Sequence, residues 1–462
     1  MALISGGALL LRLPGLNRSL EFDELYTAFH FIETEGFWET VSTYHVFNNH
    51  IAYSVLGRIS YLLFGHSDWA VRVPALVIGL GGVLFTWYFV RQLFNPQLAV
   101  LSALILAISP AHVLWSKSAR AYSALVLLPL LSSYFFLRLL QRPTRRYLFL
   151  YIIFSTIGIY FHLYVVWIIV VQGLYLLYLL LREMLAGFNG RSLGRASYRA
   201  LWFAFPTVGA LSLMLYAPVM SQLLENISLR GQSPAFNPAF PLDVVMEFGG
   251  RNSLWAAWLI LGLVVVGGLA LAKAAPQVVT YFLLTLAVPL LVMWLILRPF
   301  DLYPRFFAYL LPFYVLFLAA GLIQVWNGIK KIRPAFIRFA GTLLLAGLLG
   351  TVVFFWLVDI FTVSVSTDYR AAMQYLVEDA PHGTIMCAFG YDAEIAAYYQ
   401  DVELVYPQAI ENLDLVQPGT PINCLYHDVF WNTPQHKELA AFLAERAEMK
   451  DFGDLTIFKF VR

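Results

Sequence analysis

The sequence predicts an α-helical, multi-pass membrane protein with about eleven spans, an interfacial helix and a small C-terminal α/β domain. The chain of 462 residues is 60% hydrophobic and only 13% charged, and its mean hydropathy is +0.70. Such a chain has too few polar groups to coat a soluble globule. Apolar runs of roughly 18 residues or more recur along it. The composition then becomes charged after Ile360, which marks a soluble C-terminal segment.

Each predicted span is a mostly apolar run of nearly the length that crosses a bilayer. The spans are 1–16, 71–90, 98–115, 121–140, 147–161, 164–182, 201–219, 254–272, 277–297, 306–326 and 339–360. The run 51–64 contains Arg58 and is too short and too polar to cross, so we expect an interfacial or re-entrant helix there. The first run lacks the basic segment and cleavage motif of a signal peptide. It is also short for a span, so whether the natural chain begins earlier stays open.

The basic residues lie in every second loop between the predicted spans, so they gather on one side of the membrane. They are Arg91, Arg138, Arg142, Arg145, Arg146, Arg182, Arg191, Arg195, Arg199, Lys273, Lys330, Lys331, Arg333 and Arg338. Short loops rich in Lys and Arg stay cytoplasmic, which indicates a plasma (inner) membrane protein whose C-terminal domain is extracytoplasmic. The net charge of +2 gives no sign of nucleic-acid binding, and we expect none.

Residues 361–462 predict a separate α/β domain, after a transmembrane domain over 1–360. The expected helices are 368–379, 392–400 and 435–447, and the expected strands are 384–389, 402–406, 421–426 and 455–460. No Gly-rich phosphate loop occurs in this domain, so we expect it to shape the acceptor entrance or to contact partners. Cys387 and Cys424 lie on two of these strands. They form a disulfide in an oxidising compartment or remain two buried thiols.

An acidic pair, Asp23-Glu24, follows the first span on the predicted outer side. An unpaired carboxylate at a membrane face is costly, so such a group has a partner or a task. The alternative for Asp23 is an N-cap of a helix over 24–35, since Asp is favoured at that position.

Further motifs follow in order on the same side. They are Asn48-Asn49-His50-Ile51-Ala52-Tyr53-Ser54, Leu63-Phe64-Gly65, Arg72-Val73-Pro74, Ser109-Pro110, Ala119-Arg120-Ala121-Tyr122, Tyr160-Phe161-His162-Leu163-Tyr164 and Arg305-Phe306-Phe307-Ala308-Tyr309-Leu310-Leu311-Pro312. Together with Asp23-Glu24, this set resembles the polyprenyl-phosphate-sugar-dependent glycosyltransferases of the GT-C fold. That superfamily includes the protein O-mannosyltransferases and the aminoarabinose-lipid A transferases. The first 140 residues carry most of the likeness, and the downstream half is similar mainly in architecture.

The resemblance implies an inverting transfer of a sugar from a polyprenyl phosphate to an acceptor hydroxyl, catalysed from the outer loop 17–70. Asp23 is then the general base and Glu24 a supporting carboxylate. The remaining expected site residues bind the substrate: His50, Arg120, Tyr122, His162 and Arg305. The two arginines would hold the leaving phosphate, although an Arg at a helix end also snorkels to lipid headgroups. His50 and His162 could equally be packing residues, and Tyr122 could belong to an interfacial aromatic belt. Arg58 and Arg72 are expected to be structural, with Asp68 as one candidate partner.

The sequence also departs from the family. Many relatives carry an acidic residue before the Ala-Arg-x-Tyr motif, and this chain has Ser118 there, beside Lys117. A second carboxylate and a divalent metal are therefore left open. No His-x-x-x-His spacing indicates a metal site, and no cofactor is indicated.

Two other functions compete with a transferase: a transporter or flippase of lipid-linked sugars, and a non-catalytic subunit of a cell-envelope glycan assembly complex. Transporters commonly show internal repeats and charged or broken helices at mid-membrane. Here the ionisable residues gather at one face, which favours surface chemistry. The expected partners are a polyprenyl-phosphate-linked sugar, membrane lipids and a glycan, lipid or protein acceptor. The sequence leaves the sugar, the acceptor and the oligomeric state undefined.

Overall fold

The computed structural model describes residues 1–44, 49–185, 195–230, 237–250, 253–298, 302–362, 367–390, 392–400, 402–407, 416–428 and 433–461. The chain divides into two compact units. The first comprises Met1–Leu16, Thr40–Gly57 and Arg72–Val363, and the second comprises Asn17–Glu39, Arg58–Val71 and Ser364–Arg462. The second unit thus joins the C-terminal residues with much of the segment that follows the first helix. The functional division at residue 360 stays a prediction.

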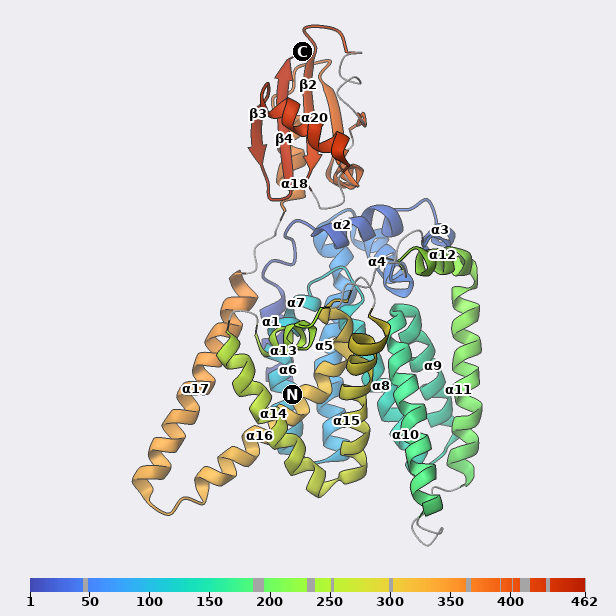
Figure 1. Ribbon diagram of the computed structural model, residues 1–462, viewed down its shortest axis with the longest axis vertical. Coiled ribbons are helices and arrows are strands. Elements are labelled where there is room, and N and C mark those ends of the chain that lie inside the picture. The colour runs from blue at the N-terminus through green and yellow to red at the C-terminus, as the bar shows by residue number, and fades with distance from the viewer. Residues whose placement is uncertain are drawn as a thin grey trace. The chain divides into compact units, whose positions relative to one another are not determined.

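The protein is mostly helical (Figure 1). Within the described residues, 8 helices are long and apolar enough to cross a membrane, which agrees with a multi-pass architecture. These spans are formed by α5 (Asp68–Leu93), α8 (Tyr122–Gln141), α10 (Val166–Leu185), α11 (Arg195–Tyr216), α14 (Leu254–Ala274), α15 (Pro276–Leu291), α16 (Leu311–Lys330) and α17 (Ala335–Thr362). Those that contain α10, α11, α15 and α16 continue into adjoining helical segments, to give Leu163–Leu185, Ala196–Ser228, Pro276–Leu297 and Pro304–Lys330. Eight of the eleven predicted spans correspond to these helices.

The other three predicted spans correspond to shorter helices. Residues 1–16 form α1 (Ala2–Arg12), and 147–161 lie in α9 (Arg145–Phe161). The span 98–115 is divided into α6 (Pro96–Ile108) and α7 (Pro110–Trp115). The division occurs because Pro110 disfavours helical geometry in the residue before it, and Ser109 is extended, with φ −61° and ψ 123°. The helix expected over 51–64 is present as α4 (Ile51–Phe64).

Short helical segments connect the longer ones. They are α2 (Phe22–Thr27), η1 (Ala28–Ile32), α3 (Phe37–Ser42), η2 (Leu163–Val165), η3 (Ala217–Val219), α12 (Met220–Arg230), α13 (Phe240–Gly249), η4 (Val292–Leu297) and η5 (Pro304–Leu310). The residues between the predicted spans 201–219 and 254–272 thus contain two helices, α12 and α13, in their described part. The Asn226 amide, part of an Asn-x-Ser motif, is buried and donates a hydrogen bond to the Tyr44 carbonyl at 2.9 Å.

A buried polar network joins four helices of the first unit. Gln172 of α10 donates to Ser132 Oγ of α8 at 3.1 Å and accepts from the Tyr151 hydroxyl of α9 at 2.7 Å. Tyr281 of α15 lies 2.7 Å from Ser133 Oγ of α8. A polar group in an apolar bundle is costly unless it finds such a partner, so this network fixes how α8 packs against its neighbours.

Two glycines allow α14 and α16 to cross in backbone contact. A Cβ atom on Gly321 would lie 2.8 Å from the Leu263 carbonyl carbon, and one on Gly267 would lie 2.9 Å from that of Phe317. Small residues permit such close approach between membrane helices. The crossing fixes the position of α16. The η5 segment directly precedes α16, so its position is fixed as well.

The C-terminal residues of the second unit form an α/β fold, as predicted. Its strands are β1 (Ile385–Gly390), β2 (Pro421–His427), β3 (Glu448–Asp451) and β4 (Leu455–Val461), in the order β1-β2-β4-β3. β1 and β2 are parallel and the other pairs are antiparallel. Helices α18 (Tyr369–Val377) and α20 (Pro434–Ala444) pack with the sheet (Figure 1). Leu439 and Leu443 of α20 join Phe389 and Phe458 in its core.

Three details of this domain differ from the prediction. The expected strand 402–406 contributes only a single bridge, between Val405 and Cys387. The expected helix 392–400 is the 3₁₀ segment η6 (Ala393–Tyr399). Strand β3 was not predicted, because all four of its residues are exposed and no alternation of apolar side chains marks it.

Of the two alternatives for Cys387 and Cys424, the structure has the disulfide. The two residues are directly paired in the β1–β2 register, and their Cα atoms are 4.4 Å apart. The alternative of two buried thiols is therefore wrong. Disulfides persist mainly in oxidising compartments.

Candidate active site

The first unit brings together all five residues that the sequence analysis expected to bind substrate. They are His50, Arg120, Tyr122, His162 and Arg305, which we call the histidine–arginine cluster. The rings of His50 and His162 are 4.7 Å apart between centroids, and the Tyr122 ring lies 5.7 Å from His50 and 6.3 Å from His162. Their roles remain predictions, but their proximity is a property of the fold.

His50 directly precedes α4, and both of its ring nitrogens contact the segment between α7 and α8. Its Nδ1 accepts a hydrogen bond from the Ala121 backbone N–H at 3.2 Å, and its Nε2 lies 3.5 Å from Arg120 Nη2. The preceding Asn49 donates to the Thr43 carbonyl at 2.7 Å and accepts from the Ser54 hydroxyl at 2.7 Å. These bonds fix the entry into α4 and thereby the direction of the imidazole.

Arg120 lies in a buried, irregular segment, 116–121, between α7 and α8. Gly79 of α5 makes room for this segment, because a Cβ atom there would lie 2.7 Å from Ser116 Cβ. Lys117 is buried too, and its Nζ donates to the Pro14 carbonyl at 3.3 Å. Lys117 therefore anchors the segment, and Arg120 is the cation that reaches the histidines.

His162 lies between α9 and η2, the short segment that leads into α10. It is extended, with φ −161° and ψ 126°, and its Nδ1 accepts from the Tyr164 backbone N–H at 3.2 Å. This side-chain cap begins the next helical segment. The ring also contacts those of Tyr164 and Phe306, at 5.4 and 5.6 Å.

Arg305 enters the cluster from η5. Its guanidinium lies 5.7 Å from the centre of the Tyr122 ring, and that of Arg120 lies 5.9 Å from the same ring. A second aromatic, Tyr303, lies 4.5 Å from the Arg305 guanidinium. Tyr122 thus has two cation–π partners, Arg120 and Arg305, which lie on different segments of the chain. The sequence analysis quoted Phe306 only as part of the Arg-aromatic motif, and it missed Tyr303, two residues before that motif, as a neighbour of the site.

Both histidines are neutral at physiological pH. Burial lowers the pKa of His162 to about 3, and the charges of Arg120 and Arg305 add to this effect. Burial is also the largest cause of a lowered pKa at His50, followed by Arg120 and its other charged neighbours. Since each Nδ1 accepts a backbone N–H, the single proton of each neutral ring resides on Nε2.

The cluster consequently presents hydrogen-bond donors and positive charge. The Tyr122 hydroxyl and His162 Nε2 are buried and have no hydrogen-bond partner among the described residues. His50 Nε2–H faces the Arg120 guanidinium, another donor. Two buried donors so close together are satisfied only by an acceptor that lies beside them, within reach of both. An anion such as a phosphate satisfies this arrangement, and two guanidinium groups supply the matching charge.

Asp23 and Glu24 belong to the second unit. The alternative that Asp23 is the N-cap of a helix over 24–35 is wrong: α2 begins at Phe22, and Glu21 is its N-cap. Glu24 completes a capping box, because its carboxylate accepts the Glu21 backbone N–H at 3.1 Å. Glu24 is buried, whereas Asp23 is half-buried in the first turn. The structure thus gives Glu24 a structural task and leaves Asp23 outside the capping box.

Arg58 has the structural role expected for it. In the second unit its guanidinium donates to the carbonyls of Ile32 and Thr34, at 2.9 and 2.5 Å. Arg72, in the first unit, donates to the Leu16 carbonyl at 2.9 Å. Asp68 forms an ion pair with Arg370, a partner that the sequence analysis did not indicate. Among the described residues, no group of three or more His, Cys, Asp or Glu could hold a metal ion.

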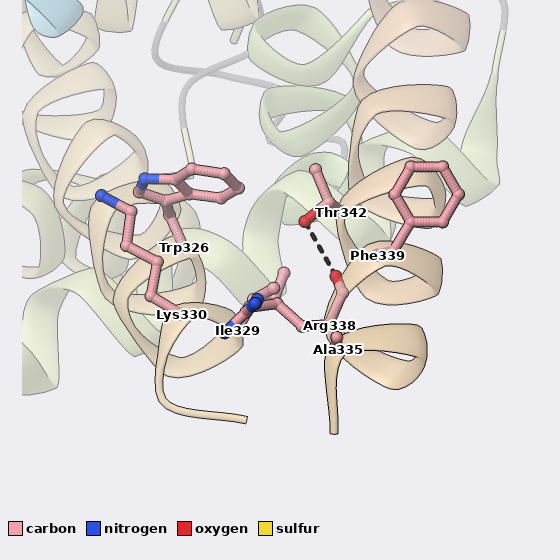
Figure 2. A pocket seen from close by; sticks show the side chains of 7 residues that line it. All are labelled: Trp326, Ile329, Lys330, Ala335, Arg338, Phe339 and Thr342. Carbon is pink, nitrogen blue, oxygen red and sulfur yellow. Dashed lines mark hydrogen bonds between the residues drawn. The ribbon is translucent and has the colours of Figure 1, made fainter. Parts of the chain in front are cut away.

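A hollow lies between α16 and α17 (Figure 2). It is lined by Trp326, Ile329, Lys330, Ala335, Arg338, Phe339 and Thr342. Lys330 lies 5.0 Å from the Trp326 ring, and the Thr342 hydroxyl donates to the Arg338 carbonyl. They come from the C-terminal end of α16 and the beginning of α17, whereas Arg305 precedes the N-terminal end of α16. The hollow is therefore separate from the histidine–arginine cluster.

A family model described as dolichyl-phosphate-mannose-protein mannosyltransferase matches residues 51–194. This segment is less than half of the chain, and it contains Arg120, Tyr122 and His162. A comparison with curated proteins finds no match.

Solved structures resemble the whole fold. ArnT from Cupriavidus metallidurans in the apo state has a TM-score of 0.64 at 14% identity, over 99% of this chain and 97% of that one. The same protein bound to undecaprenyl phosphate has a TM-score of 0.62 at 14% identity, over the same shares. The oligosaccharyltransferase AglB from Archaeoglobus fulgidus, in complex with an inhibitory peptide and a dolichol-phosphate, has a TM-score of 0.59 at 12% identity, over 86% of this chain and 63% of that one.

The resemblance to the GT-C fold is therefore confirmed. The matched segment carries the Ala-Arg-x-Tyr and His-aromatic motifs, and the likeness to ArnT extends over nearly the full length of both chains. At these levels of identity the likeness to solved structures establishes the fold. The reaction and its residues require their own argument.

Proposed function

We propose that this protein is a membrane glycosyltransferase that moves a sugar from a polyprenyl-phosphate carrier to an acceptor hydroxyl on the outer membrane face. The sugar is a hexose or a pentose, and the transfer inverts the anomeric centre. The proposal includes an extracytoplasmic C-terminal domain. The observation that carries it is the convergence of two guanidinium groups, two neutral imidazoles and a tyrosine hydroxyl in the histidine–arginine cluster.

The cluster suits the leaving group of such a transfer. As the bond between the anomeric carbon and the phosphate oxygen breaks, the electron pair remains on the phosphate, whose negative charge rises. Arg120 and Arg305 stabilise this charge, and the donors on His50, His162 and Tyr122 hold the phosphate oxygens. Preorganised donors and cations of this kind usually contribute most to catalysis.

The acceptor side requires a base. In our proposal the acceptor oxygen attacks the anomeric carbon from the face opposite the phosphate, and Asp23 takes the hydroxyl proton. Asp23 is better suited to this role than Glu24, whose carboxylate already accepts a backbone N–H in the capping box. Glu24 supports the segment that carries Asp23.

The names of similar proteins support the donor class. The family description specifies a dolichyl-phosphate mannose, and the two solved relatives carry undecaprenyl phosphate and dolichol-phosphate. Those ligands share a long isoprenoid chain with a terminal phosphate. The phosphate is the group that the histidine–arginine cluster would recognise here.

The test is transfer from radiolabelled polyprenyl-phosphate sugars by the purified full-length protein. Asp23→Asn removes the base while it keeps the size of the side chain. Glu35→Gln is the matched control, since Glu35 is an exposed carboxylate on the same segment. We expect Asp23→Asn to abolish turnover and to retain donor binding, and Glu35→Gln to behave as wild type.

Other outcomes would correct the proposal. Full turnover by Asp23→Asn would leave a transferase with a different base. No turnover by the wild-type protein with any donor, together with movement of lipid-linked sugars across liposome membranes, would identify a flippase instead.

A further inference from the structure

The Asp68 carboxylate, at the start of α5, is buried within the second unit and held by the C-terminal domain. It is only 2% exposed. Arg370, in the first turn of α18, forms an ion pair with it, and the Tyr399 hydroxyl of η6 donates a hydrogen bond to it at 3.0 Å. The Arg370 guanidinium also lies over the Tyr399 ring, 5.7 Å from its centre. We call Asp68, Arg370 and Tyr399 the clasp.

The clasp also holds the chain that leads to Asp23. The Tyr399 hydroxyl accepts hydrogen bonds from the Leu20 backbone N–H at 2.7 Å and from the Ser19 hydroxyl at 3.4 Å. Arg370 donates to the Asn17 carbonyl at 3.1 Å, and its backbone N–H donates to Ser19 Oγ at 3.3 Å. One tyrosine oxygen therefore joins three segments of the chain.

Tyr399 remains a donor toward Asp68 under all ordinary conditions. Burial raises the pKa of its hydroxyl, and the Asp68 carboxylate raises it further. The hydroxyl thus donates its single proton to Asp68 and uses its oxygen to accept from Leu20. Such a fully satisfied buried hydroxyl defines one geometry, since any shift leaves a polar group without its partner.

A second contact with the C-terminal domain lies on α2 itself. The Phe22 ring is 5.3 Å from that of His427, at the end of β2. His427 is buried, and its Nε2 lies 3.0 Å from the Tyr369 hydroxyl of α18. The helix is therefore held just before its cap through Leu20 and at its first residue through Phe22. Asp23 is the next residue.

We propose that the C-terminal domain positions Asp23 for sugar transfer through the clasp of Asp68, Arg370 and Tyr399. This inference rests on the proposed function of Asp23. It makes Arg370 and Tyr399 positioning residues, which act through α2 and touch neither donor nor acceptor. A misplacement of about 1 Å in a reacting group can lower a rate by about 100-fold, so loss of one clasp bond is enough to affect turnover.

The test compares two Tyr→Phe variants in the full-length protein. Tyr399→Phe removes the clasp hydroxyl and keeps the ring. Tyr375→Phe is the matched control, because the Tyr375 hydroxyl also donates to a carboxylate in the same unit, but to that of Glu448 on β3, at 3.1 Å. Hydrogen exchange of the amides of residues 20–27 reports on α2, and steady-state kinetics report on transfer.

We expect Tyr399→Phe to accelerate exchange in residues 20–27 by about tenfold or more, and to lower kcat by about tenfold or more, with the KM for donor unchanged. Tyr375→Phe should change neither quantity. Unchanged exchange in Tyr399→Phe would overturn the clasp. Faster exchange with an unaltered kcat would overturn the positioning of Asp23.

The exchange measurement also separates this inference from the proposed function. If the wild-type protein transfers no sugar, the proposed function fails and the positioning of Asp23 for transfer fails with it. The exchange rates then still show whether the C-terminal domain holds α2. If the wild-type protein is active, the two readouts together decide the inference.

Discussion

The imidazole rings of His50 and His162 lie 4.7 Å apart, although one precedes α4 and the other follows α9. Both are buried, and each accepts a backbone N–H at Nδ1. The pair therefore directs its Nε2 protons into the same small region as the two guanidinium groups. A site of this kind can be tested by its response to acid, to loss of charge and to displacement of its supports.

Acid should destabilise the protein through His162. Its folded-state pKa of about 3 lies below the ordinary value of 6.5, so the unfolded chain binds the extra proton between these values. Stability is complete above pH 6.5 and falls as the pH is lowered toward 3. The loss attributable to this group between pH 7 and pH 5 is about 2 kcal/mol. We expect the thermal midpoint of His162→Asn, which keeps a cap acceptor, to depend less on pH than that of wild type. An identical pH dependence would show that His162 is not buried in its neutral form.

Removal of either guanidinium of the cluster should weaken donor binding. A hydrogen bond to a charged group contributes about 1.5–3 kcal/mol, so Arg305→Met should lower the affinity for a polyprenyl phosphate by about 10- to 100-fold. Arg138→Met is the matched control. Arg138 also lies over a tyrosine, 5.0 Å from the Tyr134 ring, but at the other end of α8. Titration of both variants in detergent checks this, and equal losses would exclude a specific phosphate site.

Gly79 should be intolerant of a methyl group because of Ser116. A Cβ there displaces the segment that carries Arg120, so Gly79→Ala should reduce donor binding and turnover by about tenfold or more. Gly173→Ala on α10 meets nothing within 4 Å, and alanine there should stabilise its helix by about 0.5–1 kcal/mol. Binding and thermal midpoints of the two variants provide the comparison. Normal donor binding in Gly79→Ala would mean that Arg120 does not contact the phosphate.

Glu24 and Asp23 should respond differently to amide substitution. A Gln at the third helical position still completes a capping box, so Glu24→Gln should retain most of the activity. Glu24→Ala removes the cap, which costs about 1 kcal/mol of helix stability, and should lower turnover through disorder in α2. Loss of activity in Glu24→Gln equal to that in Asp23→Asn would instead make Glu24 a second catalytic carboxylate.

The disulfide should stabilise the C-terminal domain. It closes a loop with a sequence separation of 37 residues, for which chain entropy predicts about 4 kcal/mol. In the Cys387→Ser, Cys424→Ser double variant we expect earlier proteolysis of residues beyond 367 on heating. Wild-type protein treated with a reductant should show the same change, which controls for packing defects from serine. Equal protease resistance of all three samples would contradict this prediction.

Much of the fold could be predicted because hydrophobic length alone identifies spans. The eight long helices and the sheet strands β1, β2 and β4 follow from apolar runs and alternation. The break at Ser109–Pro110 was readable from Pro110 but was not predicted. Strand β3 and the 3₁₀ form of η6 were not readable, since tertiary pairing decides them.

The candidate site was predictable to a similar extent. The order of the family's motifs pointed to His50, Arg120, Tyr122, His162 and Arg305, and the fold places these five side chains together. The bond between Asp68 and Arg370 could not be predicted, because no periodic pattern connects residues so distant in the chain. The role of Glu24 could not be predicted, because it depends on where α2 begins. Only a helix that starts at Phe22 makes Glu24 the carboxylate that completes the capping box.

The central claim is that the histidine–arginine cluster binds the phosphate of a polyprenyl-phosphate sugar. A cryo-electron microscopy map of the full-length protein with a bound polyprenyl phosphate tests it most directly. We predict phosphate density within hydrogen-bond distance of Arg120 and Arg305, and near the Nε2 atoms of His50 and His162. Phosphate density found only elsewhere, such as beside Lys330 and Arg338 in the hollow of Figure 2, would contradict the claim.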